Sequence, residues 1–331
     1  MLTLVILVIL LALVYDFLNG MNDAANSIAT VVSTKVLSPR IAVLWAAFFN
    51  FAAIFFFGLH VATTMGKGIV QPGIIDAYAI LASLLGAGLW VHFCNTFGLP
   101  ISVSHALVGG LIGPALMIGG TKVLIFAGIK KIVLFIFLSP LIGFVVGSLM
   151  MILTLWIFKN ISPWRVDKYF RSLQLFSSAA FSLGHGSNDA QKTMGIIAIL
   201  LYNTGYLGDK FYVPAWVIIA AYLAIGLGTY AGGWKVIKTL GVGLTNLKPA
   251  GGYCAETAAA SVLFITAAMG IPVSTTHTIT GGIMGAGIVR RTSSVKWSVA
   301  YNIILAWIFT IPLSLFFSAL IYWLIKIIWL R

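Results

Sequence analysis

The chain consists of long apolar runs separated by short polar interruptions. Most runs are long enough, or nearly long enough, to cross the roughly 30 Å hydrocarbon core of a bilayer as a helix. None shows the strand alternation of a membrane barrel. The pattern therefore predicts an all-α polytopic membrane protein. The apolar runs cover roughly residues 1–19, 40–58, 74–97, 103–118, 132–158, 173–201, 213–231, 254–270, 276–289 and 298–328.

The most polar interruption lies near the midpoint and divides the chain into two halves. It extends from Lys159 to Ser172 and contains five charged residues. We therefore predict an N-terminal membrane repeat at 1–158, a cytoplasmic linker at 159–172 and a C-terminal membrane repeat at 173–331.

The two halves are related in sequence. Residues 98–113 match residues 270–285 at seven of sixteen positions, including the Pro-x-Ser-x-x-His core of each segment. An Asn-Asp pair precedes each segment, at Asn22-Asp23 and at Asn188-Asp189. Each half has five apolar runs, and an odd number inserts the second half upside down. The expected architecture is two inverted-topology repeats with the binding site near the midplane. If 103–118 or 276–289 form re-entrant hairpins, the number of crossings changes.

Composition supports the membrane assignment and limits the partners. The chain is 60% hydrophobic and 8% charged, whereas soluble domains carry about 25% charged residues. Its 20 Lys+Arg against 7 Asp+Glu give a net charge of +13. These basic residues lie mostly in short loops and form no patch interleaved with aromatics, so nucleic acid is not an expected partner. The two cysteines have no metal-binding spacing.

Loop charges predict the orientation in the cell membrane. Under the positive-inside rule the side with more Lys and Arg faces the cytoplasm, so both termini are predicted to be extracytoplasmic. Twelve basic residues fall on one side, namely Lys35, Arg40, Lys159, Arg165, Lys168, Arg171, Lys235, Lys238, Lys248, Arg290, Arg291 and Lys296, and seven on the other, namely Lys67, Lys122, Lys130, Lys131, Lys210, Lys326 and Arg331.

Four acids lie in apolar context: Asp16, Asp23, Asp189 and Glu256. Each costs about 2.5–3.5 kcal/mol at the centre of a membrane helix, which indicates a functional site. The run before Gly20 has about thirteen residues, too short to span alone, so we expect a broken helix at each Asn-Asp motif. Carboxylate, amide and carbonyl oxygens suit a hard cation such as Na⁺; hydrogen bonding between helices is the alternative. The candidate cation ligands in these motifs are Asn22, Asp23, Asn26, Asn188 and Asp189.

The second pair of motifs has the features of an anion site. Pro100 and Pro272 favour the start of a helix, and the hydroxyl residues after them are good N-caps. A helix that begins inside the membrane directs free N–H groups and its positive dipole end toward an anion. Two ordinary helix starts at the surface are the alternative. The candidate anion ligands are Ser102, Ser104, Ser274, Thr275 and Thr276, together with Gln191 and Lys192 of the second Asn-Asp motif.

Three other residues qualify the picture. Lys192 stands where the first motif has Asn26; it could offset Asp189, attract an anion or extend to the interface. His105 and His277 each follow a hydroxyl residue. Adjacent residues on a helix do not face each other, which disfavours a nucleophilic pair of hydroxyl and histidine. The chain is therefore not expected to be an enzyme.

The segments 20–26 (GMNDAAN), 184–195 (GHGSNDAQKTMG) and 272–277 (PVSTTH) resemble the signatures of the inorganic phosphate transporter (PiT) family, and the resemblance covers both halves. It implies a cation-coupled phosphate symporter built from inverted repeats. It also implies roles in ion and phosphate binding for Asp23, Asp189 and the Ser/Thr residues of the two hairpin tips, and it adds Glu256, which matches an acidic residue of the family. Some members have a second glutamate where this chain has Asn50, which bears on cation stoichiometry.

We therefore predict a secondary transporter that imports phosphate with Na⁺ by alternating access, with Glu256 joining the sodium ligands. The alternatives are a proton-coupled phosphate, metal-phosphate or sulfate permease of the same fold, and an anion channel or a membrane hydrolase. A homodimer is plausible for a protein of this type.

Overall fold

The structure, a computed structural model, describes residues 1–56, 58–289 and 291–329, so Arg290 and Arg331 of the charge count lie outside the described residues. The described residues form helices and no named strand. The first half contains α1 (Leu2–Ser33), α2 (Pro39–Ala52), α3 (His60–Lys67), α4 (Ala77–Thr96), α5 (Val103–Gly119) and α6 (Phe126–Ile157). The second contains α7 (Pro163–Asn203), α8 (Ala215–Ala231), α9 (Trp234–Lys238), α10 (Pro249–Ala268), α11 (Thr275–Ile288) and α12 (Trp297–Trp329).

The helices confirm a polytopic membrane protein. By length and apolar composition, five helical spans among the described residues could cross a membrane, and up to seven could if each of two bent pairs is one span. The pair α2–α3 bends by 85° and the pair α8–α9 by 64°. The described residues thus contain bent helix pairs at two positions that the sequence analysis did not single out.

At the Asn-Asp motifs themselves the expected breaks are wrong, because α1 and α7 run through them without interruption. The glycines there allow close packing instead. A Cβ on Gly20 would lie 2.2 Å from the carbonyl oxygen of Ile225, and one on Gly186 would lie 2.3 Å from that of Asn50. The short apolar run before Gly20 can continue as a helix because the polar motif is covered by protein and not by lipid.

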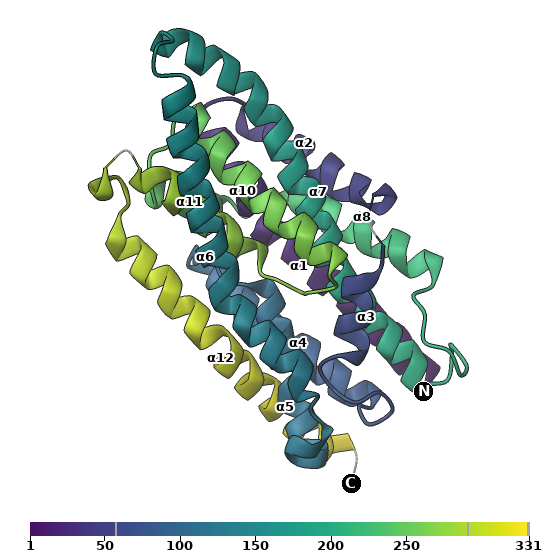
Figure 1. The fold of residues 1–331 in the computed structure, drawn as a ribbon. Coiled ribbons are helices and arrows are strands. Elements are labelled where there is room, and N and C mark those ends of the chain that lie inside the picture. Colours follow the sequence, from purple (N-terminus) through teal and green to yellow (C-terminus); the bar gives the residue numbers. More distant parts are fainter. Residues whose placement is uncertain (57, 290, 330–331) are drawn as a thin grey trace.

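Two helical hairpins enter the bundle from opposite ends. In Figure 1, α4 and α5 occupy the lower half and α10 and α11 the upper half, while both chain termini lie at the lower end. Each hairpin turns at a glycine with positive φ, Gly98 at 68° and Gly270 at 64°, a conformation that costs other residues more. The tips meet in the interior, where the Thr276 hydroxyl donates to the Ile101 carbonyl at 3.0 Å. The structure therefore contains two helical hairpins whose tips lie inside the bundle, while their re-entry into the membrane stays a prediction.

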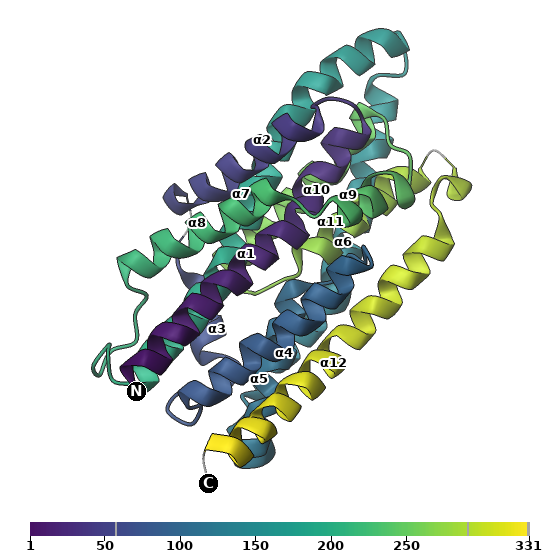
Figure 2. The same cartoon turned by 180° about the vertical axis from the view of Figure 1, so that it is seen from behind.

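The two halves hold each other by reciprocal packing, which Figures 1 and 2 show from both sides. Helix α6 packs along α11 and α12 packs along α5, while α1 packs along α8 and α7 along α2. Glycines permit the hairpin contacts: a Cβ on Gly281 would lie 2.1 Å from the Pro140 oxygen, and one on Gly109 would lie 2.5 Å from the Ile311 oxygen. Aligned residues of the two halves thus make equivalent contacts.

The connection between the halves is shorter than the polar segment suggests. Only residues 158–162 separate α6 from α7, because Pro163 at the N1 position starts α7. The outward faces of α6 and α12 expose large apolar side chains, as hydrocarbon contact requires; those on α6 include Leu134, Phe137, Leu141, Val145, Leu149 and Ile152.

Candidate functional site

The site forms where four helices converge. Helices α1 and α7 carry the two Asn-Asp motifs, and the N-termini of α5 and α11 reach them from opposite ends of the bundle. Each hairpin helix begins at a serine N-cap: Ser102 Oγ accepts from the His105 N–H at 3.1 Å, and Ser274 Oγ accepts from the His277 N–H at 3.2 Å. The predicted caps are confirmed at these two serines, so their hydroxyls hold the helix starts in place.

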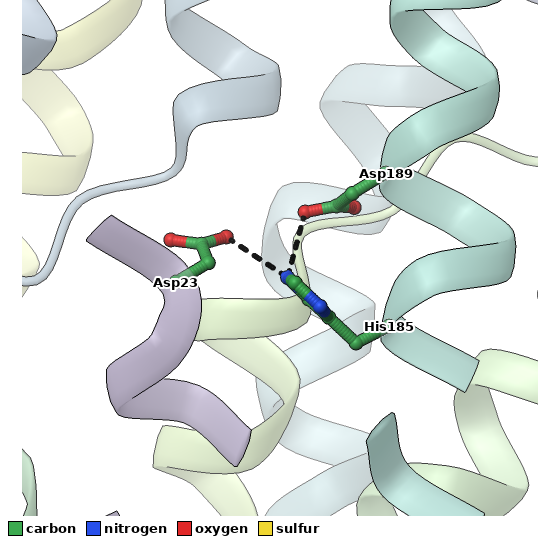
Figure 3. A group of neighbouring side chains, drawn as sticks. All are labelled: Asp23, His185 and Asp189. Carbon is green, nitrogen blue, oxygen red and sulfur yellow. Dashed lines mark ion pairs between the residues drawn. The ribbon is translucent and has the colours of Figure 1, made fainter. Parts of the chain in front are cut away.

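The two aspartates lie on either side of one histidine. Figure 3 shows Asp23 of α1 and Asp189 of α7 directed toward His185, whose Nε2 lies 3.8 Å and 3.4 Å from their respective Oδ2 atoms. One ligand atom from each of the three residues lies within 4.8 Å of the others. The opposite ring nitrogen, Nδ1, lies 2.9 Å from Asn50 Oδ1, which fixes the ring. Two carboxylates from separate halves therefore share one buried centre.

Hydroxyls of the α11 tip join this centre. The Thr275 hydroxyl lies 3.1 Å from Asp23 Oδ2 and 3.3 Å from Asp189 Oδ2, so it can donate to either carboxylate. Thr276 lies 3.4 Å from Asp23 Oδ1 and accepts from the Asn26 amide at 2.9 Å. The structure thus brings the predicted cation residues and the predicted anion residues into direct contact.

Lys192 is buried in the same centre. Its Nζ donates to Asp189 Oδ1 at 2.6 Å, to the Val273 carbonyl at 2.7 Å and to the Ser104 hydroxyl. The side chain is 2% exposed, so the ammonium does not extend to the membrane surface. It connects the α7 motif to both hairpin tips.

Of three further predicted residues, one bonds to the centre and two do not. Asn22 donates its amide to the adjacent Asp23 at 2.7 Å. Asn188 instead donates to the Leu263 carbonyl of α10 at 3.1 Å. Gln191 holds the start of α3, since its Oε1 accepts from the N–H groups of Val61 and Ala62. Neither Asn188 nor Gln191 contacts the carboxylate centre through these bonds.

Glu256 belongs to a second polar cluster. It accepts from Thr30 at 2.6 Å, from the Gln174 amide at 2.9 Å and from the Ser177 hydroxyl. Thr30 lies seven residues beyond Asp23, about 10 Å along the helix at 1.5 Å per residue. The sequence pattern did not identify Thr30, Gln174 and Ser177 as partners of Glu256, because none of the three belongs to a repeated motif.

The two tip histidines face each other and not the hydroxyl residues before them. The ring centroids of His105 and His277 lie 4.8 Å apart, and His277 stacks on Trp307 at 3.7 Å. Hence no Ser–His pair of the nucleophilic type is assembled here. Asp16, also on α1, is buried without a hydrogen bond of ordinary geometry.

The centre is closed to solvent. Asp23, Asp189, Lys192, Thr275 and Ser104 are each at most 6% exposed. Two buried amide oxygens nevertheless lack a hydrogen-bond partner among the described residues, Asn22 Oδ1 and Asn26 Oδ1. Unpaired buried oxygens beside a carboxylate are suited to bind a cation.

Comparisons with known proteins agree with this geometry. A family model described as the phosphate transporter family matches residues 19–318. A probable low-affinity inorganic phosphate transporter of Rhizobium meliloti (strain 1021) is 53% identical over 314 residues, covering 95% of this chain and 94% of that protein. A Bacillus subtilis (strain 168) protein of the same description is 39% identical over 330 residues, covering 99% of each. The solved structure of a sodium-dependent phosphate transporter superposes with a TM-score of 0.84 at 25% identity, covering 98% of this chain and 100% of that one. The resemblance drawn from the motifs is confirmed, and the matched proteins are transporters and not enzymes.

Proposed function

The chain belongs to the phosphate transporter family and is a multi-pass membrane protein, and from this premise we propose that it imports phosphate together with Na⁺ by alternating access. The observation that carries the proposal is the contact of the Thr275 hydroxyl with both buried aspartates. This contact supports the proposal because it would bring an anion-binding helix start next to cation-binding carboxylates. The sodium-dependent transporter of the same fold supports Na⁺ as the partner ion.

Phosphate would bind between the hairpin tips. The first turns of α5 and α11 supply free N–H groups and the positive ends of two helix dipoles. Ser104, Thr275 and Thr276 add hydroxyl donors beside them, and Lys192 contributes a positive charge to the site. The adjacent carboxylates favour phosphate over sulfate. Near neutral pH phosphate retains an O–H group that can donate a hydrogen bond to a carboxylate, whereas sulfate has no O–H group and would be repelled.

Na⁺ would bind on the carboxylate side of the same centre. Asp23 and Asn26 of α1 offer a carboxylate and an amide oxygen, and Asp189 of α7 faces them across Thr275. The anion and the cation neutralise each other in a medium of low dielectric, so each strengthens the binding of the other, and such coupling is reciprocal. Glu256 would act outside this centre, through its own cluster with Thr30 and Gln174.

Alternating access follows from the closed centre and the opposed hairpins. The structure has the centre sealed from both ends, and a transport cycle must open it to one end at a time. The hairpins enter from opposite ends, which supports an inverted-repeat relation and gives each side of the membrane its own gate (Figure 1). Both termini lie at the end opposite the α6–α7 connection, where Lys159 and the basic residues Arg165, Lys168 and Arg171 at the start of α7 gather, which supports placing the termini outside the cell.

Transport in proteoliposomes tests the proposal. Purified protein should accumulate labelled phosphate against its gradient when an inward Na⁺ gradient is imposed, and excess sulfate should compete weakly. His185 lies between the two aspartates, which favours a proton-coupled mechanism as the second candidate. Accumulation driven by a pH gradient alone would replace the Na⁺ assignment by that candidate. Dissipation of a phosphate gradient without any ion requirement would indicate a channel.

The Thr275 hydroxyl should contribute strongly to affinity. Thr275→Val keeps the shape but removes a hydroxyl that contacts two carboxylates, and hydrogen bonds to charged groups contribute about 1.5–3 kcal/mol. We expect the apparent Km for phosphate to rise about 10- to 100-fold. The matched control is Thr278→Val, since among the described residues that hydroxyl bonds to the Ser274 carbonyl one turn back and to no carboxylate. Equal Km values for both variants would contradict the shared role of Thr275.

A further inference from the structure

We propose that the ammonium of Lys192 permanently occupies the second of two equivalent cation positions, so that only the position at Asp23 remains open to an exchangeable ion. The inference rests on the proposed function and refines its stoichiometry. It comes from comparing the hydrogen bonds of the two halves atom by atom.

The first position is built from oxygens of α1 and of both hairpin tips. Asp23 Oδ1 lies 3.4 Å from the Thr276 hydroxyl, and that hydroxyl lies 3.0 Å from the Ile101 carbonyl oxygen. Asn26 donates to the same hydroxyl, while its own Oδ1 has no partner and is buried. The set is a carboxylate, a hydroxyl, a backbone carbonyl and a free amide oxygen.

The second position repeats this set with one change. Asp189 Oδ1, the Ser104 hydroxyl and the Val273 carbonyl are the corresponding oxygens. The residue that replaces the asparagine is Lys192, and its Nζ binds all three oxygens at once.

The correspondence is given by the sequence repeat and not by proximity alone. Asp189 and Lys192 each lie 166 residues after Asp23 and Asn26. The tip residues Val273 and Thr276 each lie 172 residues after Ile101 and Ser104. Each aspartate is thus grouped with the hydroxyl of one tip and the carbonyl of the other, linked through the Thr276 hydroxyl in the first position and through Lys192 Nζ in the second, and the two tips exchange these roles.

The bonding of Lys192 argues that its charge is part of the scaffold. An ammonium has three N–H donors, and three protein oxygens accept them. No donor is therefore left for direct contact with phosphate in this closed conformation. Burial at 2% exposure of the side chain keeps the ammonium from the interface, so the three oxygens can hold no other cation while it remains.

The consequence is a lower ion requirement for each phosphate. One positive charge that would otherwise enter with the substrate is already present, so phosphate should bind with about one Na⁺, and the Hill coefficient for Na⁺ should be about 1. A chain with asparagine in both positions should need about two and show a coefficient approaching 2.

Equilibrium binding of labelled Na⁺ to purified full-length protein, with saturating phosphate, tests this directly. We expect about one Na⁺ per wild-type chain and about two for Lys192→Asn, with the Hill coefficient of uptake rising in parallel. Asn26→Lys is the converse variant, which should bind none. Lys210→Asn, which removes an exposed loop charge, is the control and should behave as wild type.

The outcomes separate this inference from the proposed function. Two Na⁺ per wild-type chain would overturn the role of Lys192, whether or not any variant folds. One Na⁺ in both the wild type and Lys192→Asn would overturn it as well, while sodium coupling stands. No Na⁺ in the wild type but one in Lys192→Asn would support the role of Lys192 and overturn sodium coupling. Binding to neither protein would overturn both.

Discussion

Replacement of Asp23 by asparagine should abolish Na⁺-stimulated phosphate uptake. The substitution keeps the shape of the side chain but removes the charge of the carboxylate that α1 supplies to the open cation position. The attraction between one carboxylate charge and one Na⁺ at 4 Å is about 4 kcal/mol at an effective dielectric constant of 20. That corresponds to a loss of close to a thousandfold in Na⁺ affinity, since about 1.4 kcal/mol is tenfold. Labelled phosphate uptake in proteoliposomes, measured across a series of Na⁺ concentrations, gives the result.

A loop acid provides the comparison for Asp23. Asp209→Asn removes the same charge from an exposed position between α7 and α8 and should leave uptake unchanged. Full Na⁺-stimulated uptake by Asp23→Asn would show that the cation binds elsewhere, with the Glu256 cluster as the next candidate.

Replacement of Gly281 by alanine should disable the transporter through packing. Its Cβ would lie 2.1 Å from the Pro140 backbone oxygen, and α6 has no flexible side chain there to move aside. Overpacking of this kind costs about 1–3 kcal/mol, which corresponds to a fall in melting temperature of about 2–12 °C in detergent. Because α11 carries Thr275 and Thr276, a shift of the helix by about 1 Å should lower uptake about a hundredfold.

The control for Gly281 is another helical glycine. A Cβ on Gly88 would meet only Tyr15, at an ordinary 3.8 Å, so Gly88→Ala should fold normally and gain slightly in helix propensity. Equal melting temperatures and equal uptake for the two alanine variants would show that the contact between α6 and α11 can relax.

The repeat made the most informative parts of the fold predictable. Matching Ser102 with Ser274 identified two helix starts at equivalent places, and a helix that begins inside a membrane must be covered by protein. The acids Asp23 and Asp189 were identifiable because an unpaired charge in an apolar run is costly.

What the sequence did not reveal depends on partners distant in the chain. Gly20 could be a helix break or a packing contact, and only the position of α8 decides between them. Gln191 follows Asp189 closely, yet it faces the start of α3 because the helix turns about 100° per residue. The role of Lys192 required knowing which carbonyl lies opposite its ammonium, and Val273 carries no side-chain signal for that contact.

The reciprocal packing has a consequence for biosynthesis. The first half is synthesised before α11 and α12. During that interval Asp23 lacks its contact with Thr275 of α11, and α5 lacks its packing against α12. The acid gains its contacts with Thr275 and Thr276 only when the α10–α11 hairpin is in place. The chain should therefore reach its protease-resistant form in one late step, and an N-terminal fragment that ends at the α6–α7 connection should not acquire it alone.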